Sequence, residues 1–532
     1  MSKRNLVILS CLAVFAGCGG GEDAGPVVAG TTGGGNAGSE PTSRVASFTQ
    51  AEGTQRIWEG VAIGSGDLPA MPSYPQITLD DRGMALASWR DLLGPSQLVT
   101  SVTDGDGKWS AAQVLAGSAG TASGYSSYVQ RTNAAGQRVL LSSQSGEYAD
   151  SAVNHAFFFT PSIGWSGAVP LSRELAADSP NASDLTVTDD GTALVSVLGY
   201  DSLANPQDTT APAELYRVRP DGAASVGLAG VSIAENGLIL APRQSTHRHA
   251  AFAMAPRDPD VAAIQGYFLW QEVSLSFPQY SSLGVLRPSI DGAQTTFPHR
   301  AFGLHLSDEH FPAGSPFAAT CDTAGLPIGK ALSAPSAIFI LGVGTSSGEC
   351  MLVPSLYAET DSSWGITTGT IATGDLGDVR LLTNEAGSAL LLWSQTDRST
   401  GSTEYWWSQA RNGHQWDRPA RLAKALGVDD TALDSVAMAM SPAGEAVIAF
   451  STKGPRLQNL RSGQLNYARF NFKSGWGGKT EIAQGNYNLG FGIAVDINRN
   501  GKAVVLYTVA PCFVPGDAKT NCTSPSVYAY TL

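Results

Sequence analysis

Charged side chains are scarce in this chain of 532 residues. Asp, Glu, Lys and Arg make up 15% of it, and the 46 acids outnumber the 33 bases, giving a net charge of −13. Such a balance argues against nucleic acid as a partner, because a polyanion would be repelled. Long helices are also missing from the pattern, since no apolar period of 3.6 residues is sustained. The sequence therefore excludes helical and alternating strand-and-helix folds.

Glycine and proline are abundant, with 60 and 29 copies, and 43% of the residues are hydrophobic. This composition is rich in turns and still apolar enough to fold, unlike a disordered chain. Length alone would allow three or four domains. The repeats described below indicate one large domain instead.

The N-terminus has the composition of an export signal. Lys3 and Arg4 precede an apolar run from Leu6 to Ala16, which is shorter than the roughly 20 residues needed to span a bilayer. The run ends in Phe15-Ala16-Gly17-Cys18. This ending resembles the lipobox of bacterial lipoproteins, with Phe15 where that family usually has Leu.

The lipoprotein resemblance implies that residues 1–17 are removed and that Cys18 becomes the lipidated first residue. Gly19 in place of Asp at the second position implies the outer membrane of a Gram-negative bacterium. Residues 18–53 are rich in glycine and have no apolar periodicity, so we expect a flexible tether of roughly 30 Å. The folded domain then spans residues 54–532.

One pattern recurs along this domain: an apolar strand, an Asp/Asn-x-x-Gly-like turn, and a second apolar strand. Adjacent clear copies place their glycines 53, 55, 57 and 57 residues apart. Asp or Asn can accept local backbone hydrogen bonds, and glycine can take a positive φ, so each copy predicts a β-hairpin. Paired acids such as Asp80/Asp81 are interpreted as part of this turn chemistry. The six clear copies are centred on Gly83, Gly136, Gly191, Gly387, Gly444 and Gly501.

A second signature follows the hairpins: a tryptophan, then Leu or Ile six or seven residues later. The tryptophans at the start of fourth strands are interpreted as packing between sheets. They are Trp58, Trp109, Trp165, Trp364, Trp416 and Trp476. A period of 50–60 residues predicts four-stranded blades, and hence an all-β propeller with eight blades, or seven as the alternative.

The two ends of the domain predict how the last blade is completed. The final repeat stops after three strands, near Ser526–Leu532, whereas Arg56–Ile63 is an isolated strand carrying Trp58. We expect this N-terminal strand to complete the last blade, which removes exposed sheet edges.

The repeats resemble secreted bacterial propellers of the sialidase-like, Asp-box type. Thr103–Trp109 (TDGDGKW) and Asn412–Trp416 (NGHQW) keep parts of an Asp box. The resemblance implies the fold class and transfers no catalytic residue, because the arginine triad and Arg-Ile-Pro motif of that family cannot be placed here.

Variable connections are expected on the blade face opposite the short hairpin turns, where ligands usually bind. Five of the seven histidines fall in one window, in the connections before and after one blade. They are His247, His249, His299, His305 and His310. They are candidate ligands for a transition metal if they converge; the alternative is solvated loop histidines. No cofactor is expected.

Four cysteines remain after export and lipidation. Cys512 and Cys522 lie ten residues apart, which predicts a disulfide, and Cys321–Cys350 follows by elimination. Free thiols are the alternative.

The sequence thus predicts a monomeric, lipid-anchored propeller that binds a protein or glycan partner without catalysis. The alternative is a glycan-active hydrolase or lyase on a sialidase-like propeller, with catalytic residues unknown.

Overall fold

The protein is described here by a computed structural model, which covers residues 48–532 except for a set of connecting segments. The omitted segments are 61–71, 92–96, 105, 119–125, 146–151, 172–180, 189, 199–212, 226–244, 255–263, 275–280, 292–293, 306–327, 332–335, 345–348, 359–362, 367–369, 412–414, 430–432, 458–459, 514–520 and 523. Cys18, His310 and Cys321 therefore lie outside the described residues.

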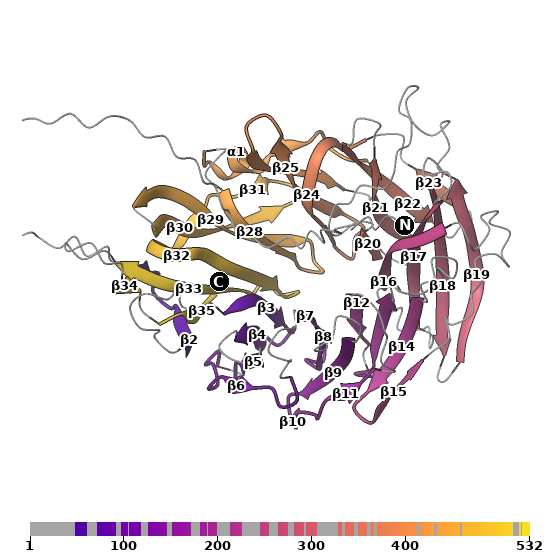
Figure 1. The fold of residues 1–532 in the computed structure, drawn as a ribbon, viewed down its shortest axis with the longest axis horizontal. Helices are drawn as coiled ribbons and strands as arrows, with labels where there is room; N and C mark the ends of the chain where they lie inside the picture. The colour runs from indigo at the N-terminus through magenta and orange to yellow at the C-terminus, as the bar shows by residue number, and fades with distance from the viewer. Residues whose placement is uncertain are drawn as a thin grey trace, which may run out of the picture. The chain divides into compact units, whose positions relative to one another are not determined.

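The described chain is almost entirely β-structure, built from successive antiparallel sheets (Figure 1). The first sheet contains β3 (Ser73–Leu79), β4 (Ala85–Asp91), β5 (Gln97–Val102) and β6 (Gln113–Val114). The second contains β7 (Ser126–Thr132), β8 (Arg138–Ser145) and β9 (Ala152–Thr160), with β10 (Gly164–Trp165) and β11 (Val169–Pro170) both pairing with β9. The third contains β12 (Asn181–Val187), β13 (Ala193–Leu198), β14 (Ala213–Arg219) and β15 (Gly222–Ser225).

The middle of the chain repeats this arrangement. The fourth sheet contains β16 (Ser245–Met254), β17 (Ile264–Ser274), β18 (Ser281–Asp291) and β19 (Gln294–His305). Next come β20 (Ile328–Ala331), β21 (Ser336–Gly344), β22 (Cys350–Ala358) and β23 (Ser363–Ile366). The start of β24 pairs with β22, which joins them to β24 (Ala372–Thr383), β25 (Ala389–Asp397), β26 (Ser402–Ala410) and β27 (Ala420–Arg421).

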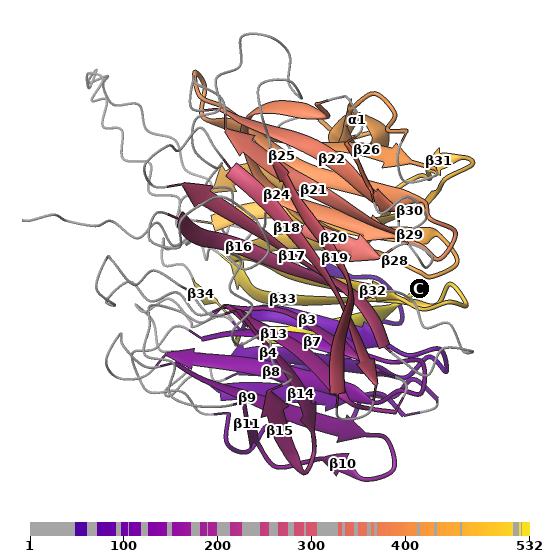
Figure 2. The ribbon, with the colours of Figure 1, turned by 90° about the vertical axis from the view of Figure 1, so that its right-hand side faces the viewer.

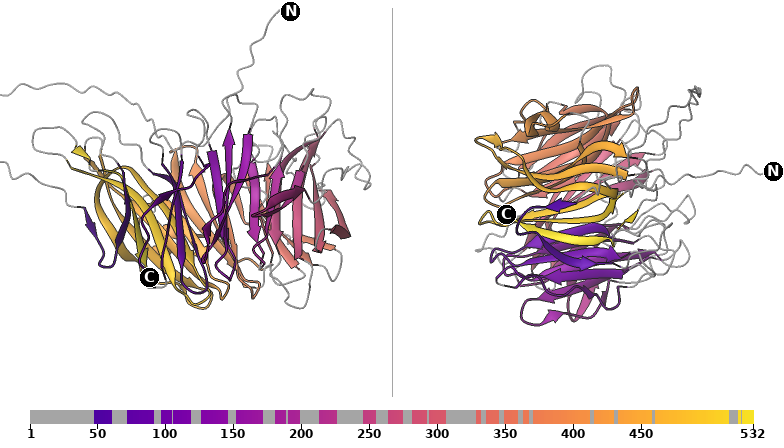
Figure 3. Two further views of the ribbon diagram at one scale, coloured as in Figure 1. Left: turned by 90° about the horizontal axis from the view of Figure 1, so that it is seen from below. Right: turned by 90° about the vertical axis from the view of Figure 1, so that its left-hand side faces the viewer.

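The C-terminal sheet contains strands from both ends of the chain. Its C-terminal members are β28 (Leu433–Met440), β29 (Glu445–Leu457), β30 (Leu460–Asn471), β31 (Gly475–Trp476), β32 (Thr480–Ile497), β33 (Ala503–Phe513), β34 (Asn521–Cys522) and β35 (Ser526–Thr531). From the N-terminus, β2 (Gln55–Glu59) pairs with β35, as the sequence predicts, and β1 (Thr49–Gln50) pairs with β32. Figure 3 shows the indigo N-terminal strand beside the long yellow strands.

Neighbouring sheets pack face to face through apolar side chains that alternate along the strands. Leu98 of the first sheet shares a buried cluster with Leu140 and Phe157 of the second. The last sheet packs on the first in the same way, because Val504 and Leu506 share a buried cluster with Ile77, Trp89 and Ile57. The hydrophobic core therefore lies between sheets.

Helix is nearly absent from the described residues, as the sequence predicts. The described part contains α1 (Leu422–Leu426), which ends at Gly427 with φ 66°. None of its helices is long and apolar enough to cross a membrane.

Candidate functional site

Six hairpin turns lie at one end of the first strands, at the glycines that the sequence marks. Gly83, Gly136, Gly191, Gly387, Gly444 and Gly501 all have φ between 79° and 95°. In each turn the first residue donates its N–H to the carbonyl four residues on, as Asp80 does to Met84 over 3.0 Å. In five of them its side chain also accepts from the N–H of that residue. The predicted turn chemistry is confirmed.

Polar side chains at this end of the sheets form hydrogen bonds and ion pairs with neighbouring hairpin turns. Asn498 Nδ2 donates to the carbonyl of Asp80 over 3.0 Å, and Asn133 Nδ2 donates to that of Thr188 over 2.8 Å. Arg499 binds Glu385 with two nitrogens and also lies beside Asp81. These hydrogen bonds use the polar side chains internally, so this end has a structural role.

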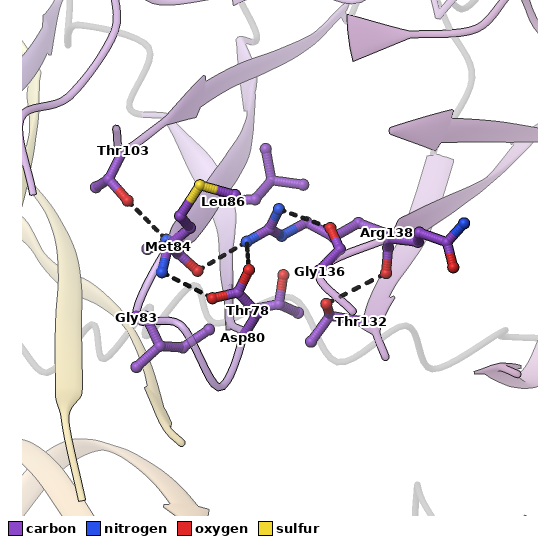
Figure 4. Close-up of polar contacts among 12 residues, drawn as sticks. Thr78, Asp80, Gly83, Met84, Leu86, Thr103, Thr132, Gly136 and Arg138 are labelled. Carbon is purple, nitrogen blue, oxygen red and sulfur yellow. Dashed lines mark hydrogen bonds and ion pairs between the residues drawn. The ribbon is translucent and has the colours of Figure 1, made fainter. Parts of the chain in front are cut away.

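Arg138 is the most buried cation of the turn end (Figure 4). Its side chain and that of Asp80 are both 0% exposed and form an ion pair with 3.6 Å between Nη2 and Oδ2. Arg138 also donates to the carbonyls of Met84 (2.7 Å) and Gly136 (3.0 Å). Burial lowers the pKa of Arg138 to about 10, against the opposing effect of Asp80 and Asp496.

Asp496 of β32 links the last sheet to the first. Its Oδ2 accepts from Leu79 N over 2.6 Å, and its Oδ1 accepts from Ile497 N over 2.9 Å. Burial raises the pKa of this carboxyl to about 6, although these two hydrogen bonds, Arg131 and Arg138 act in the opposite direction.

The opposite ends of the first two sheets carry a different cluster, which we call the Tyr74 cluster: Tyr74, Ser88, Arg90, Tyr128, Ser142 and His155. Arg90 is 1% exposed; its Nη2 donates to Ser142 Oγ over 3.2 Å, and its guanidinium lies 5.6 Å from the centre of the Tyr128 ring. Burial lowers the pKa of Arg90 to about 10, while Tyr128 and Tyr74 oppose this shift.

Tyr128 joins the two sheets through its phenol. The hydroxyl donates to the carbonyl of Tyr74 and contacts the carbonyl of Ser88 at 2.9 Å. Burial raises the pKa of Tyr128 above its ordinary value. The phenol therefore stays protonated and acts as a hydrogen-bond donor.

His155 completes the cluster from the strand beside Ser142, its register partner on β8. It is half-buried, burial lowers its pKa, and its Nδ1 has no hydrogen-bond partner among the described residues. Sequence reasoning missed Arg90, Tyr128 and His155 as members of a cluster, because none of them belongs to a recurring sequence motif.

The histidines that the sequence singled out lie elsewhere, in the fourth sheet (Figure 2). His247 and His249 belong to β16, and His299 and His305 belong to β19, so their assignment to connecting loops was wrong. The strands extend through residues that composition alone assigned to loops. His247 and His305 share one row across the sheet, through Glu272 and Ser282. Three strand spacings separate their backbones, roughly 14 Å.

The side chains of these four histidines lie outside the described part of the structure, as His310 does, so the metal site stays a prediction. Within the described part of the chain, no group of three or more His, Cys, Asp or Glu side chains is placed to hold a metal ion.

The tryptophans of the second signature lie where the fourth strands begin or in β2. Trp165, Trp364 and Trp476 belong to β10, β23 and β31, and Trp109 and Trp416 form single bridges with Thr103 and Ala410. Trp58 belongs to β2. Trp109, Trp165, Trp416, Trp476 and Trp58 contact apolar clusters between sheets.

Cys512 and Cys522 are register partners on β33 and β34. Directly opposed residues of an antiparallel pair have Cα atoms about 4.5–5.5 Å apart, which is within the range of a disulfide. Cys350 is buried. Both disulfides stay predictions.

No protein-family model matches the chain, and no curated protein matches it. Several solved structures are similar at low identity. The NanB sialidase from Streptococcus pneumoniae is 13% identical, with 90% of this chain and 70% of that chain covered and a TM-score of 0.32. A protein of unknown function from Dyadobacter fermentans is 10% identical (90% and 99% covered, TM-score 0.36). An α-L-arabinanase from Penicillium chrysogenum is 11% identical (53% and 98% covered, TM-score 0.29). The description of the fold rests on the strand pairing above.

Proposed function

We propose that this protein is an exported, monomeric β-propeller of eight blades that binds a glycan or protein partner at the strand ends opposite the hairpin turns. Lipid on Cys18 anchors it to the outer membrane of a Gram-negative bacterium. The strand pairing supports eight blades, because the C-terminal sheet divides into β28–β31 and the group β32, β33, β35 and β2. Pairing of β2 with β35 supports closure by the N-terminal strand.

The observation that carries the binding function is the difference between the two strand ends. Side chains of the turn end donate hydrogen bonds to backbone carbonyls of neighbouring turns. At the other end, Tyr74 is 64% exposed, and its backbone carbonyl accepts a hydrogen bond from the buried Tyr128, whose ring lies against the buried Arg90. Binding sites of proteins built from repeated sheets lie where loops vary, and not where every repeat needs the same turn.

A hydrolase or lyase would need catalytic groups at this end, usually two carboxyls in glycoside hydrolysis. In the described part of the chain, Asp496 is the one carboxyl whose pKa is raised, and both of its oxygens already accept backbone hydrogen bonds. It also lies two residues from the turn residue Asn498. Within the described residues this supports binding, and a glycan-active hydrolase or lyase on the same fold stays the alternative.

The test blocks one end at a time. The lipidated protein, purified in detergent, is screened on a glycan array and against envelope proteins from a Gram-negative host. Ser399→Cys, in the exposed connection between β25 and β26, and Asn500→Cys, in an exposed hairpin turn, are each coupled to polyethylene glycol. We expect polymer at residue 399 to abolish capture and polymer at residue 500 to leave it unchanged. The reverse result would refute the proposal, and release of new reducing ends from a bound glycan would indicate the enzyme.

A further inference from the structure

Tyr74 has a backbone conformation that tyrosine rarely adopts. Its φ is 52°, and Asp378 is the other described residue besides glycine with a positive φ. The pairing of β3 with β4 shifts register between Ser73 and Gln76, so Tyr74 lies in a β-bulge. Bulges change the direction of a side chain at the end of a strand.

Asp378 occupies the equivalent position of another repeat, six residues before its turn residue, as Tyr74 is before Asp80. There the carboxylate binds Arg380 with both oxygens, over 2.8 and 3.0 Å. The ring of Tyr74 is 64% exposed instead. The same backbone position thus serves an internal ion pair in one sheet and presents an aromatic face to solvent in another.

The second sheet holds Tyr74 in place. Tyr128 donates its phenol hydrogen to the carbonyl of Tyr74. Two residues further on, Gln76 donates through Nε2 to the carbonyl of Tyr128 over 2.6 Å and accepts from Gln130 N over 2.8 Å. These contacts fix the backbone on both sides of the bulge, so no backbone entropy need be lost there when the exposed ring binds a ligand.

The surroundings indicate the class of ligand. The other exposed large apolar side chains of the described residues are Val114 on β6 and Ile163 in the turn after β9, so Tyr74 shares no extended apolar patch with the described residues. A protein interface usually has such a patch at its centre. A single exposed aromatic ring among polar groups suits a small ligand with one apolar face, and the net charge of −13 disfavours a polyanion. A neutral sugar ring has these properties.

We infer that Tyr74 is a stacking platform for the C–H face of a neutral pyranose, with Tyr128 as a positioning residue that holds its backbone. This inference rests on the proposed function, because it places the ligand at the same strand ends.

The test uses cellohexaose, mannohexaose and β-1,4-galactohexaose as probes, with dissociation constants measured by calorimetry on the full lipidated protein in detergent. For the hexaose that binds, we expect Tyr74→Ala to weaken binding at least about 10-fold. Tyr74→Phe should stay within about 2-fold, because stacking needs the ring and not the hydroxyl. Ile163→Ala is the matched control, which removes an exposed apolar side chain from the turn between β9 and β10 and should change nothing.

Two further variants separate binding from folding. Tyr74→Gly relieves the positive φ and should raise the melting temperature while weakening binding as much as Tyr74→Ala. Tyr128→Phe keeps the buried ring but loses the hydroxyl, and should weaken binding about 3-fold to 10-fold, with the wild-type number of sites.

The inference is wrong if none of the hexaoses binds, if Tyr74→Ala binds them like wild type, or if Tyr74→Phe loses binding. A protein partner whose capture depends on Tyr74 would also overturn it. In that last case the capture screen above still finds a partner blocked at residue 399, so the proposed function stands while this inference falls.

Discussion

Replacing Arg138 with Met tests whether the buried polar contacts of the turn end stabilise the fold. The guanidinium is fully buried, donates to the carbonyls of Met84 and Gly136, and forms an ion pair with the buried carboxylate of Asp80. Methionine has a similar length and fills the space, so the loss is mainly electrostatic.

The expected cost follows from what remains behind. Without Arg138, the Asp80 carboxylate stays at 0% exposure with no cation, and two carbonyls lose a charged donor. Removing one partner of a buried ion pair typically costs about 3–5 kcal/mol in the free energy of unfolding. We expect Arg138→Met to fall in this range.

Asp80→Asn provides the matched second perturbation. Asparagine stands at the same turn position in three other repeats, as Asn133, Asn384 and Asn498, and accepts the same backbone hydrogen bond. Asp80→Asn alone should therefore lose the ion pair but keep the turn, which lowers the free energy of unfolding by about 1–3 kcal/mol. In the double variant the two costs should overlap, with a coupling energy of about 1–3 kcal/mol.

The assay is urea denaturation followed by fluorescence, which gives the midpoint and slope for each variant. Arg469→Met is the control, because Arg469 forms the ion pair with Glu445 at 35% exposure of each side chain and should cost less, about 1 kcal/mol. A cost below about 1 kcal/mol for Arg138→Met, or strictly additive single variants, would refute the reasoning.

Three further outcomes are expected. Because the pKa of the Asp496 carboxyl is raised to about 6 in the fold from its ordinary 3.8, wild type should lose up to about 3 kcal/mol relative to Asp496→Asn as pH rises from 4 to 7; equal pH profiles in urea would contradict this. Ile57→Ala, in the N-terminal strand, should cost about 2–4 kcal/mol by calorimetry, whereas the exposed neighbour Glu59→Ala should cost under about 0.5 kcal/mol. Unreduced peptide mapping should find Cys512 linked to Cys522, and Ser at both positions should lower stability by about 2–3 kcal/mol.

The hairpin turns and the pairing of the N-terminal strand with the last strand were predictable from the sequence. The turns depend on local chemistry. A positive φ requires glycine at Gly83 and its equivalents, and Asp or Asn before it satisfies backbone donors. The pairing of β2 with β35 followed from counting strands, since a four-stranded repeat with three strands leaves one place.

The polar clusters were not predictable, because their burial depends on the neighbouring sheet. Arg90 and Arg138 lie within strands outside any recurring motif, and only packing against the next sheet makes them 1% and 0% exposed. For the same reason the histidines of β16 and β19 were assigned to loops. Strand length in that sheet is set by pairing with β17 and β18, which local composition does not reveal.

The bulge at Tyr74 explains how a binding residue can arise in this fold without a new backbone. Asp378 shows that the repeat already holds a non-glycine residue at positive φ in this position, with an ion pair in place of a ring. Both repeats therefore adopt this strained backbone conformation at the same position with different side chains, so the side chain at this position can vary. At the turn end, by contrast, Arg138 and Asp80 contact the backbone of adjoining turns, so a change of side chain there alters the packing of two sheets. Variation of the side chain at residue 74 itself changes the exposed surface and not these buried contacts, which is why we place ligand recognition there.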